Sequence, residues 1–141
     1  MAYERVDALT ESQIRDLHAL YQGEWWSSGR TLDEIRVMLD HCRPIMGFLD
    51  ALGGPLVGFA RVLTDRVYKA FIFDVIVHRD HRGRGLGEAI LDGILTHPDL
   101  RKVQMIELYC RPELAPWYTR WGFTTDCAGC VLMRRMGAAT S

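Results

Sequence analysis

The sequence predicts an α/β (α+β) protein with one mixed, twisted sheet of about six to seven strands and about four helices. Two observations support this fold class. The 141 residues are 48% apolar and 25% charged, as in a soluble globular domain with a single core. Segments of helical periodicity and β-branched segments also alternate irregularly, without the repetition of βαβ units. We therefore expect one domain over residues 1–136, followed by a flexible tail over 137–141.

Two capping boxes predict where the first helices begin. Thr10 precedes Gln13 by three residues, and Thr31 precedes Glu34 in the same way. In such pairs each side chain accepts a hydrogen bond from the other residue's backbone N–H at the start of a helix. The first helix is expected to end near Gly23. The apolar residues of the second helix recur at helical spacing, at Ile35, Met38, Leu39 and Cys42.

Strands are predicted where β-branched and aromatic residues gather between turn residues. The expected strands cover residues 3–6, 44–50, 56–63, 68–77, 103–109, 123–125 and 131–136. Helices are expected over residues 85–96 and from Pro112 onward, where apolar residues return to helical spacing. Asp74 is the only ionisable side chain from Ala70 to Val77, so one acid is expected inside the most apolar strand.

The charge balance argues against polyanionic partners. Seventeen Lys and Arg residues are balanced by eighteen Asp and Glu residues, a net charge of −1, so neither nucleic acid nor an anionic membrane is expected to bind. No apolar run approaches the roughly 20 residues of a membrane span, and the first residues lack the pattern of a secretion signal. We expect a cytoplasmic protein with reduced thiols, and the sequence leaves a homodimer open.

A glycine-rich segment connects the most apolar strand to the next helix. The residues from Arg82 to Gly87 (RGRGLG) precede that helix directly, which places unpaired backbone N–H groups at the positive end of the helix dipole. Glycines let the backbone approach a ligand closely, and the arginines supply positive charge for a phosphate or pyrophosphate. The alternative is a tight turn between strand and helix that binds nothing.

Two motifs resemble the GNAT superfamily of N-acetyltransferases. Arg82, Gly85 and Gly87 match its acyl-CoA loop pattern R/Q-x-x-G-x-G/A, and residues 117–123 (WYTRWGF) are similar to its aromatic-Tyr-x-x-x-Gly-Phe segment. The chain differs at Arg111, where many members have Asn. The resemblance implies the GNAT (acyl-CoA N-acyltransferase) fold and transfer of acetyl from acetyl-CoA to a primary amine by direct attack in a ternary complex. The positions that it implies for acetyl-CoA binding are Val75, Val77, Arg82, Gly83, Arg84, Gly85 and Gly87.

Acetyl transfer to an amine requires an unprotonated amine and a proton for the departing thiolate. Tyr118 matches the family tyrosine that commonly supplies this proton, and packing on the apolar face of its helix is the alternative role. Asp74 is a candidate base because burial would raise its pKa. A structural hydrogen bond or the attraction of a cationic acceptor are the alternatives for Asp74. Glu107 is a weaker candidate base, because a solvated strand face explains it more simply.

The segment between the first two helices is implied by the resemblance to form part of the acceptor pocket. It contains Glu24, Trp25, Trp26 and Arg30. Two adjacent tryptophans in a polar loop suggest an aromatic wall for a cationic or hydrophobic amine, and packing of the loop on the core is the alternative. The chain has no insertion that would build a long peptide groove, so a small-molecule amine is favoured as the acceptor.

Two further functions stay open from the sequence. One is a non-catalytic acyl-CoA-binding regulatory module, and the other is a protein or peptide N-acetyltransferase. A degenerate module would be expected to lose Tyr118 or Asp74, so the presence of both favours the enzyme.

Metal binding is not expected. His78 and His81 lie in a loop beside the arginines, where histidines are usually solvated. Cys127 and Cys130 have no second pair of ligands at zinc spacing, so they are expected to be thiols in a turn.

Overall fold

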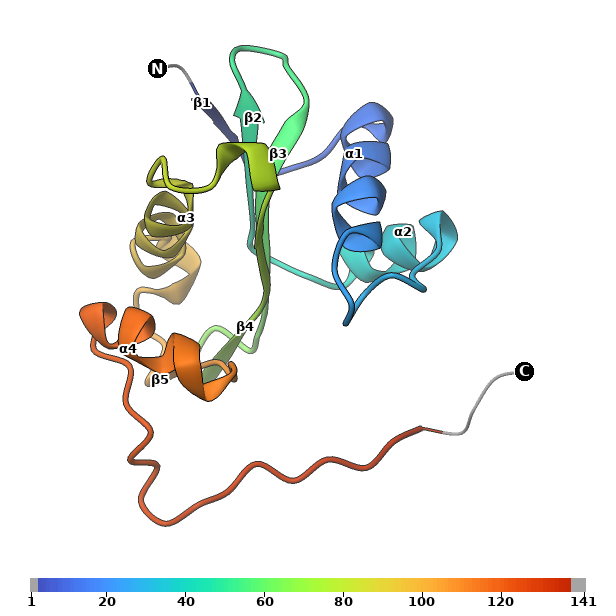
Figure 1. Cartoon of the computed structure of the whole chain (residues 1–141). Helices are drawn as coiled ribbons and strands as arrows, with labels where there is room; N and C mark the ends of the chain where they lie inside the picture. The colour runs from blue at the N-terminus through green and yellow to red at the C-terminus, as the bar shows by residue number, and fades with distance from the viewer. Residues whose placement is uncertain (1–2, 138–141) are drawn as a thin grey trace. The chain divides into compact units, whose positions relative to one another are not determined.

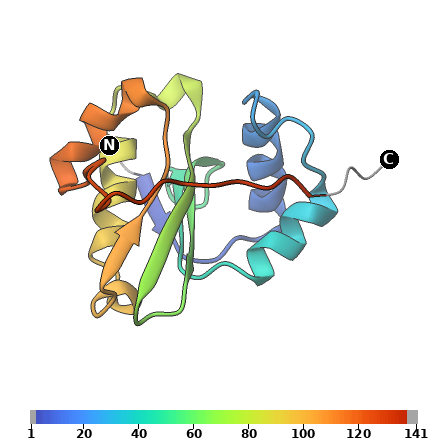
Figure 2. The ribbon, with the colours of Figure 1, turned by 90° about the horizontal axis from the view of Figure 1, so that it is seen from below.

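The computed structural model describes residues 3–137. The chain divides into two compact units, residues 1–108 and 109–141. The first unit contains the sheet, and Figures 1 and 2 show α1 and α2 on one face of this sheet and α3 on the other. The elements of this unit are β1 (Tyr3–Val6), α1 (Glu11–Gln22), α2 (Leu32–Asp40), β2 (Ile45–Asp50), β3 (Leu56–Thr64), β4 (Lys69–Val77), α3 (Leu86–Leu95) and β5 (Met105–Glu107).

The sheet is mixed, as predicted. Its strand order is β1-β2-β3-β4-β5, with antiparallel pairing from β1 to β4 and parallel pairing between β4 and β5. The parallel pair is connected through α3, which is the crossover that two parallel neighbours require. The predicted fold class is therefore confirmed.

Both capping boxes are present where the sequence placed them. The Thr10 hydroxyl accepts from the Gln13 N–H at 3.3 Å, and the Gln13 side chain accepts from the Thr10 N–H at 2.9 Å. Thr31 and Glu34 exchange the same two bonds at the start of α2. Because α2 ends at Asp40, Cys42 lies beyond the helix in which its spacing placed it, although its side chain is buried.

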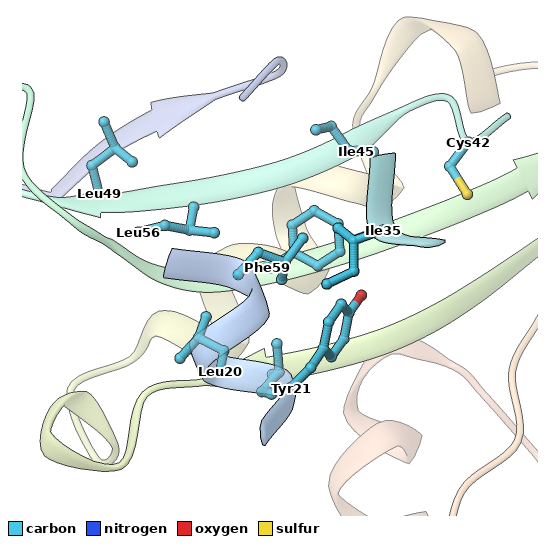
Figure 3. Close-up of a cluster of buried hydrophobic side chains, with 10 residues drawn as sticks. Leu20, Tyr21, Ile35, Cys42, Ile45, Leu49, Leu56 and Phe59 are labelled. Carbon is cyan, nitrogen blue, oxygen red and sulfur yellow. The ribbon is translucent and has the colours of Figure 1, made fainter. Parts of the chain in front are cut away.

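One cluster of the core of the first unit lies between the sheet and the pair α1 and α2 (Figure 3). Tyr21 of α1 is fully buried in it, with its ring edge-on to Phe59 of β3 at 6.4 Å between centroids. The buried members are Leu17, Leu20, Tyr21, Ile35, Cys42, Ile45, Leu49, Leu56, Phe59 and Ile76. This packing fixes α1 against the strands that carry the site.

The second unit is built from short helical turns. A 3₁₀ turn at Pro112–Leu114 leads into α4 (Ala115–Tyr118), and a second 3₁₀ turn follows at Thr119–Trp121. The helix predicted from Pro112 is thus present, divided into three short pieces. Gly122 ends it with a φ of +85°, a left-handed conformation that glycine adopts without strain.

The two closing strands predicted over 123–125 and 131–136 are absent. Residues 122–137 contain neither helix nor strand, and those from 124 onward are exposed. Their described hydrogen bonds are local turns, such as the Cys130 N–H to the Cys127 carbonyl at 3.0 Å. An apolar pattern forms a strand only when a neighbouring strand supplies the ladder, and none does here. The sheet therefore has five strands, fewer than expected.

Two smaller predictions concern the ends of the chain. The strand predicted over 103–109 is shorter, because β5 covers only Met105–Glu107. The predicted flexible tail lies outside the described residues except for Gly137. Among residues 3–137, no helix has the length and apolar composition needed to cross a bilayer.

Candidate functional site

A β-bulge in β4 sets the backbone at Asp74. Phe59 pairs with Ile76 and Arg61 pairs with Phe73, so two residues of β4, Asp74 and Val75, stand opposite a single residue of β3. Asp74 has a φ of +59°, a left-handed conformation that Asp tolerates better than most residues. The bulge redirects the strand at the one acid of its apolar run.

The Asp74 carboxylate is the centre of a hydrogen-bonded cluster. Its Oδ2 accepts from the Tyr21 hydroxyl at 2.9 Å, from Arg30 Nη1 at 2.7 Å and from Arg61 Nε at 2.6 Å. The Asp74 side chain is only 7% exposed. These partners come from α1, from the segment before α2 and from β3, so the fold joins three elements at one carboxylate oxygen.

The pKa of Asp74 is lowered, which corrects the prediction that burial would raise it. Burial is the largest single cause and does raise the pKa, but the hydrogen bonds and charges of Arg30 and Arg61 together outweigh it. The carboxylate is therefore a weaker proton acceptor than an ordinary Asp. Burial, followed by the charge of Asp74, raises the pKa of Tyr21, so its hydroxyl keeps the proton that it donates.

The glycine segment forms an open hollow at the start of α3. Gly83 has a φ of +77° and Gly85 a φ of +83°, and a Cβ at either position would meet no atom within 4 Å. Gly85 is the N-cap of α3 and provides no side chain to the first turn, so the helix N–H groups lack a side-chain cap. The hollow has a volume of about 170 Å³ and is lined by Val77, His81, Arg82, Gly83, Gly85, Leu86, Gly87 and Glu88.

Arg82 connects this hollow to the loop after α1. Its Nε donates to the Val77 carbonyl at 3.1 Å, and its Nη2 donates to Glu24 Oε1 at 2.9 Å. Glu24 was predicted as an acceptor-side residue and Arg82 as a cofactor-side residue, and the structure brings the two into direct contact. Arg84 is exposed beside them.

β4 and β5 separate shortly after they pair. The parallel register covers only Lys69 to Phe71 of β4, whereas β4 continues to Val77. The predicted cofactor positions Val75 and Val77, both half-buried, lie in the part of β4 that has no β5 pairing. Such a separation leaves backbone groups on one edge of a strand accessible to a ligand.

The loop after α1 carries the two predicted tryptophans. Trp25 is 72% exposed and Trp26 is 38% exposed. The Arg30 guanidinium lies over the Tyr21 ring at 4.5 Å and over the Trp26 ring at 5.5 Å. Trp26 and Arg30 are therefore part of the surroundings of Asp74, as an acceptor pocket next to β4 would require.

A second hollow opens beside the Asp74 cluster. It has a volume of about 290 Å³ and is lined by Arg30, Glu34, Ile35, Met38 and Arg61. Ile35 is buried and gives it an apolar wall, whereas Glu34 is exposed. The hollow thus combines apolar surface with the two arginines that bind Asp74.

Tyr118 is buried in the second unit. Its ring lies edge-on to Trp117 at 4.8 Å and to Phe123 at 6.1 Å between centroids. Burial, followed by the nearby Cys110, raises the pKa of Tyr118 to about 12. The phenol therefore holds its proton throughout the neutral range.

Most of the chain matches one family of enzymes. Residues 9–123 fit the model of the acetyltransferase (GNAT) family. This chain belongs to the GNAT family. It is similar to the uncharacterized N-acetyltransferase ycf52 of Porphyra purpurea, with 29% identity over 118 residues that cover 82% of this chain and 67% of that protein.

Other acetyltransferases match this chain over different shares of its length. A chloroplastic serotonin N-acetyltransferase 2 of Oryza sativa subsp. japonica is 29% identical over 99 residues, which are 69% of this chain and half of the rice protein. A putative GNAT acetyltransferase structure from Xanthomonas campestris pv. campestris superposes with a TM-score of 0.83 at 28% identity, over 97% of this chain and 94% of that chain. These likenesses agree with a GNAT acetyltransferase enzyme.

Two residues of the Asp74 cluster were not predicted from the sequence. Tyr21 and Arg61 were not among the site residues expected from the sequence. Arg61 is the one charged residue of β3 (LVGFARVLT), which is the same signal that pointed to Asp74. Two opposite charges in adjacent apolar strands predict a buried ion pair, and this signal was available in the sequence.

The remaining sequence candidates have local partners in this GNAT chain. Glu107 forms an ion pair with Lys69 at 2.7 Å, and both side chains are partly exposed. Arg111 is exposed and lies 4.0 Å from Glu113. Within residues 3–137, no group of three or more His, Cys, Asp or Glu side chains is arranged to hold a metal ion.

Proposed function

We propose that this GNAT enzyme transfers the acetyl group of acetyl-CoA to the primary amine of a small molecule, by direct attack in a ternary complex. The observation that carries this proposal is the open hollow at the start of α3, next to the end of β4 at Val77. The second hollow, of about 290 Å³, has the size of a small-molecule site and supports a small acceptor over a long peptide.

The glycine segment fits the phosphates of coenzyme A. The first turn of α3 presents backbone N–H groups without a side-chain cap, and Arg82 and Arg84 add positive charge. Gly83 and Gly85 leave the surface beside the backbone open. When bound, acetyl-CoA supplies a thioester whose carbonyl carbon is open to an amine.

The residues of the chain then have separate tasks in this proposal. Backbone groups at Val75 and Val77, on the part of β4 that has separated from β5, hold the pantetheine arm and polarise the thioester carbonyl. Tyr118 gives its proton to the departing thiolate, which its high pKa allows at neutral pH. The amine proton leaves to solvent water, because a carboxylate with a lowered pKa takes protons poorly. We assign Asp74 a positioning role, in which it holds Arg30 and Arg61.

Acetyl-CoA should stabilise the folded protein, so the Tm should increase with the concentration of acetyl-CoA. At a hundredfold excess over Kd, the free energy of unfolding should rise by about 2.7 kcal/mol. Gly85→Asp should abolish this shift, because it places a carboxylate beside the pyrophosphate site. Gly129→Asp is the matched control, since Gly129 has nearly the same φ of +81° and equally open space but lies outside the hollow.

A scanning fluorimetry series with acetyl-CoA, NAD and ATP decides the outcome. Stabilisation by NAD or ATP without stabilisation by acetyl-CoA would contradict the proposed cofactor. Acetyl-CoA binding without thiol release across a panel of amines would favour the non-catalytic regulatory module instead. Thiol release with peptide amines alone would favour a peptide N-acetyltransferase.

The cytoplasmic location of the protein stays a prediction.

Substitution of the loop tryptophans tests the acceptor side. Trp26→Ala should raise the KM for the amine several-fold more than the KM for acetyl-CoA. Trp26 lies against Arg30, which lines the second hollow, where we propose that the amine binds. Trp25→Ala should act in the same direction. Steady-state kinetics with each substrate varied in turn measures both constants. Equal changes in the two KM values would mean that the loop has only a structural role.

A further inference from the structure

We infer that the acceptor of this enzyme carries an anionic group, a carboxylate or a phosphate, in addition to its amine, and that Arg30 and Arg61 bind this group. The inference rests on the proposed transfer to a small amine and adds the chemical class of the substrate. It starts from the hollow of about 290 Å³ that both arginines line.

Within the Asp74 cluster beside this hollow, the cations outnumber the carboxylates. Arg30 and Arg61 both bind Oδ2 of a single buried carboxylate, Asp74, so two cations share one anion. Glu34 also lines the hollow and carries a negative charge, but it is exposed, so solvent screens its attraction to the two arginines. A second anion placed between the guanidiniums would balance the positive charge that Asp74 alone does not neutralise.

Both guanidiniums have donors to spare. Each presents five N–H groups. The described hydrogen bonds of their side chains use Nη1 of Arg30, and Nε and Nη1 of Arg61, the latter to the Cys42 sulfur at 3.5 Å. Planar guanidiniums bind carboxylate and phosphate oxygens in pairs, so the remaining N–H groups suit either anion.

The two arginines are also held in position before any ligand binds. Arg30 lies over the rings of Tyr21 and Trp26, and Arg61 lies over the Phe73 ring at 4.7 Å. Side chains that are already ordered lose little entropy when they bind an anion.

The position of the cluster connects it to the transfer reaction. Asp74 directly precedes Val75, whose backbone we propose as part of the thioester site. An acceptor whose anion binds Arg30 and Arg61 therefore has its amine held near the bulge of β4 at Asp74 and Val75. The volume of the hollow limits the acceptor to a small molecule with its amine and its anion a few bonds apart.

Matched pairs of amines test the inference. β-Alanine is compared with β-alaninamide for the carboxylate, and O-phosphoethanolamine with ethanolamine for the phosphate. Binding is measured by isothermal titration calorimetry with coenzyme A present, so that the glycine segment does not compete for the phosphate. We expect the anionic member of at least one pair to bind roughly 10–100-fold more tightly than its neutral partner. The pair that responds identifies the anion.

Two variants should change this preference in opposite directions. Arg30→Gln removes one cation, so the anionic preference should fall to within a few-fold of unity. Asp74→Asn keeps an oxygen acceptor for the two arginines but removes the competing negative charge, so the preference should increase. Arg66→Gln is the control, because Arg66 pairs with Asp99 and does not line the hollow. A purely structural role for Arg30 would weaken both members of a pair equally, and circular dichroism of each variant reports folding separately.

Equal affinities within both pairs, absence of binding by both anionic members, or an unchanged preference in Arg30→Gln would each overturn the inference. These results are separate from a failure of the proposed function. Thiol release from acetyl-CoA with a neutral amine preferred would support the acetyltransferase proposal and reject the anionic acceptor. If acetyl-CoA is neither bound nor cleaved, the proposed function fails, while the carboxylate pair and its response to Arg30→Gln still decide whether Arg30 and Arg61 form an anion site.

Discussion

Replacing Tyr118 with phenylalanine is expected to lower kcat by roughly 10²–10⁴-fold, the usual contribution of a general acid. The substitution keeps the ring and its packing against Trp117 and Phe123, so the Tm should change little. Acetyl-CoA affinity should stay within a few-fold, because the hydroxyl acts only as the thiolate departs. Thiol release at saturating amine measures kcat, and scanning fluorimetry measures the other two quantities.

The pH profile adds a second test of this role. Because the pKa of Tyr118 is raised to about 12, deprotonation of this phenol should not reduce activity at pH values up to its ordinary pKa of about 10. Any alkaline decline due to Tyr118 lies above that range and should be missing in Tyr118→Phe. Tyr109→Phe, at an exposed tyrosine of the same unit, is the control and should keep wild-type kcat. Wild-type kcat in Tyr118→Phe would reduce the residue to a packing role.

Replacing Asp74 with alanine is expected to lower the free energy of unfolding by about 3–5 kcal/mol at pH 7. The variant leaves two arginines and the buried Tyr21 hydroxyl without their shared acceptor, and it places alanine at a φ of +59°. Urea unfolding followed by circular dichroism measures the loss. Glu107→Gln breaks a partly exposed ion pair between β5 and Lys69 of β4, and it should lower the free energy of unfolding by less than about 1 kcal/mol.

The sign of the pH dependence follows from the lowered pKa of Asp74. The unfolded chain takes up a proton near the ordinary pKa of 3.8, whereas the folded protein does so only at lower pH. This contribution to stability is therefore present above pH 3.8 and is lost as the pH falls through the folded pKa. Asp74→Asn, which also tolerates the left-handed backbone, should lack this part of the acid destabilisation. An Asp74→Ala variant no less stable than Glu107→Gln would contradict the role of the cluster.

Several features could be predicted from the sequence because their partners lie within a few residues of one another. The capping boxes at Thr10 and Thr31 are complete within four residues, so the starts of α1 and α2 were predicted correctly. The glycine segment is equally local, because the strand, the positive-φ glycines and the helix start follow each other directly. The GNAT assignment rested on such local motifs and is confirmed by the family match.

The number of strands could not be predicted in the same way. Residues 131–136 have a strand-like composition, but whether they form a strand depends on an edge to pair with, and composition does not reveal one. β5 likewise pairs with β4 over three residues only, because the two strands separate after Phe71. The tertiary structure alone determines where these ladders end.

The properties of Asp74 show most clearly what the sequence determines and what depends on tertiary packing. The sequence by itself determined that an acid stands in the apolar strand β4, and it determined the glycine segment and Tyr118. Only the tertiary structure decided the direction of the pKa, since Tyr21, Arg30 and Arg61 come from 53, 44 and 13 residues away. Burial is a property of the strand and could be inferred, whereas the hydrogen bonds that outweigh it depend on how α1, its following loop and β3 pack around one oxygen atom.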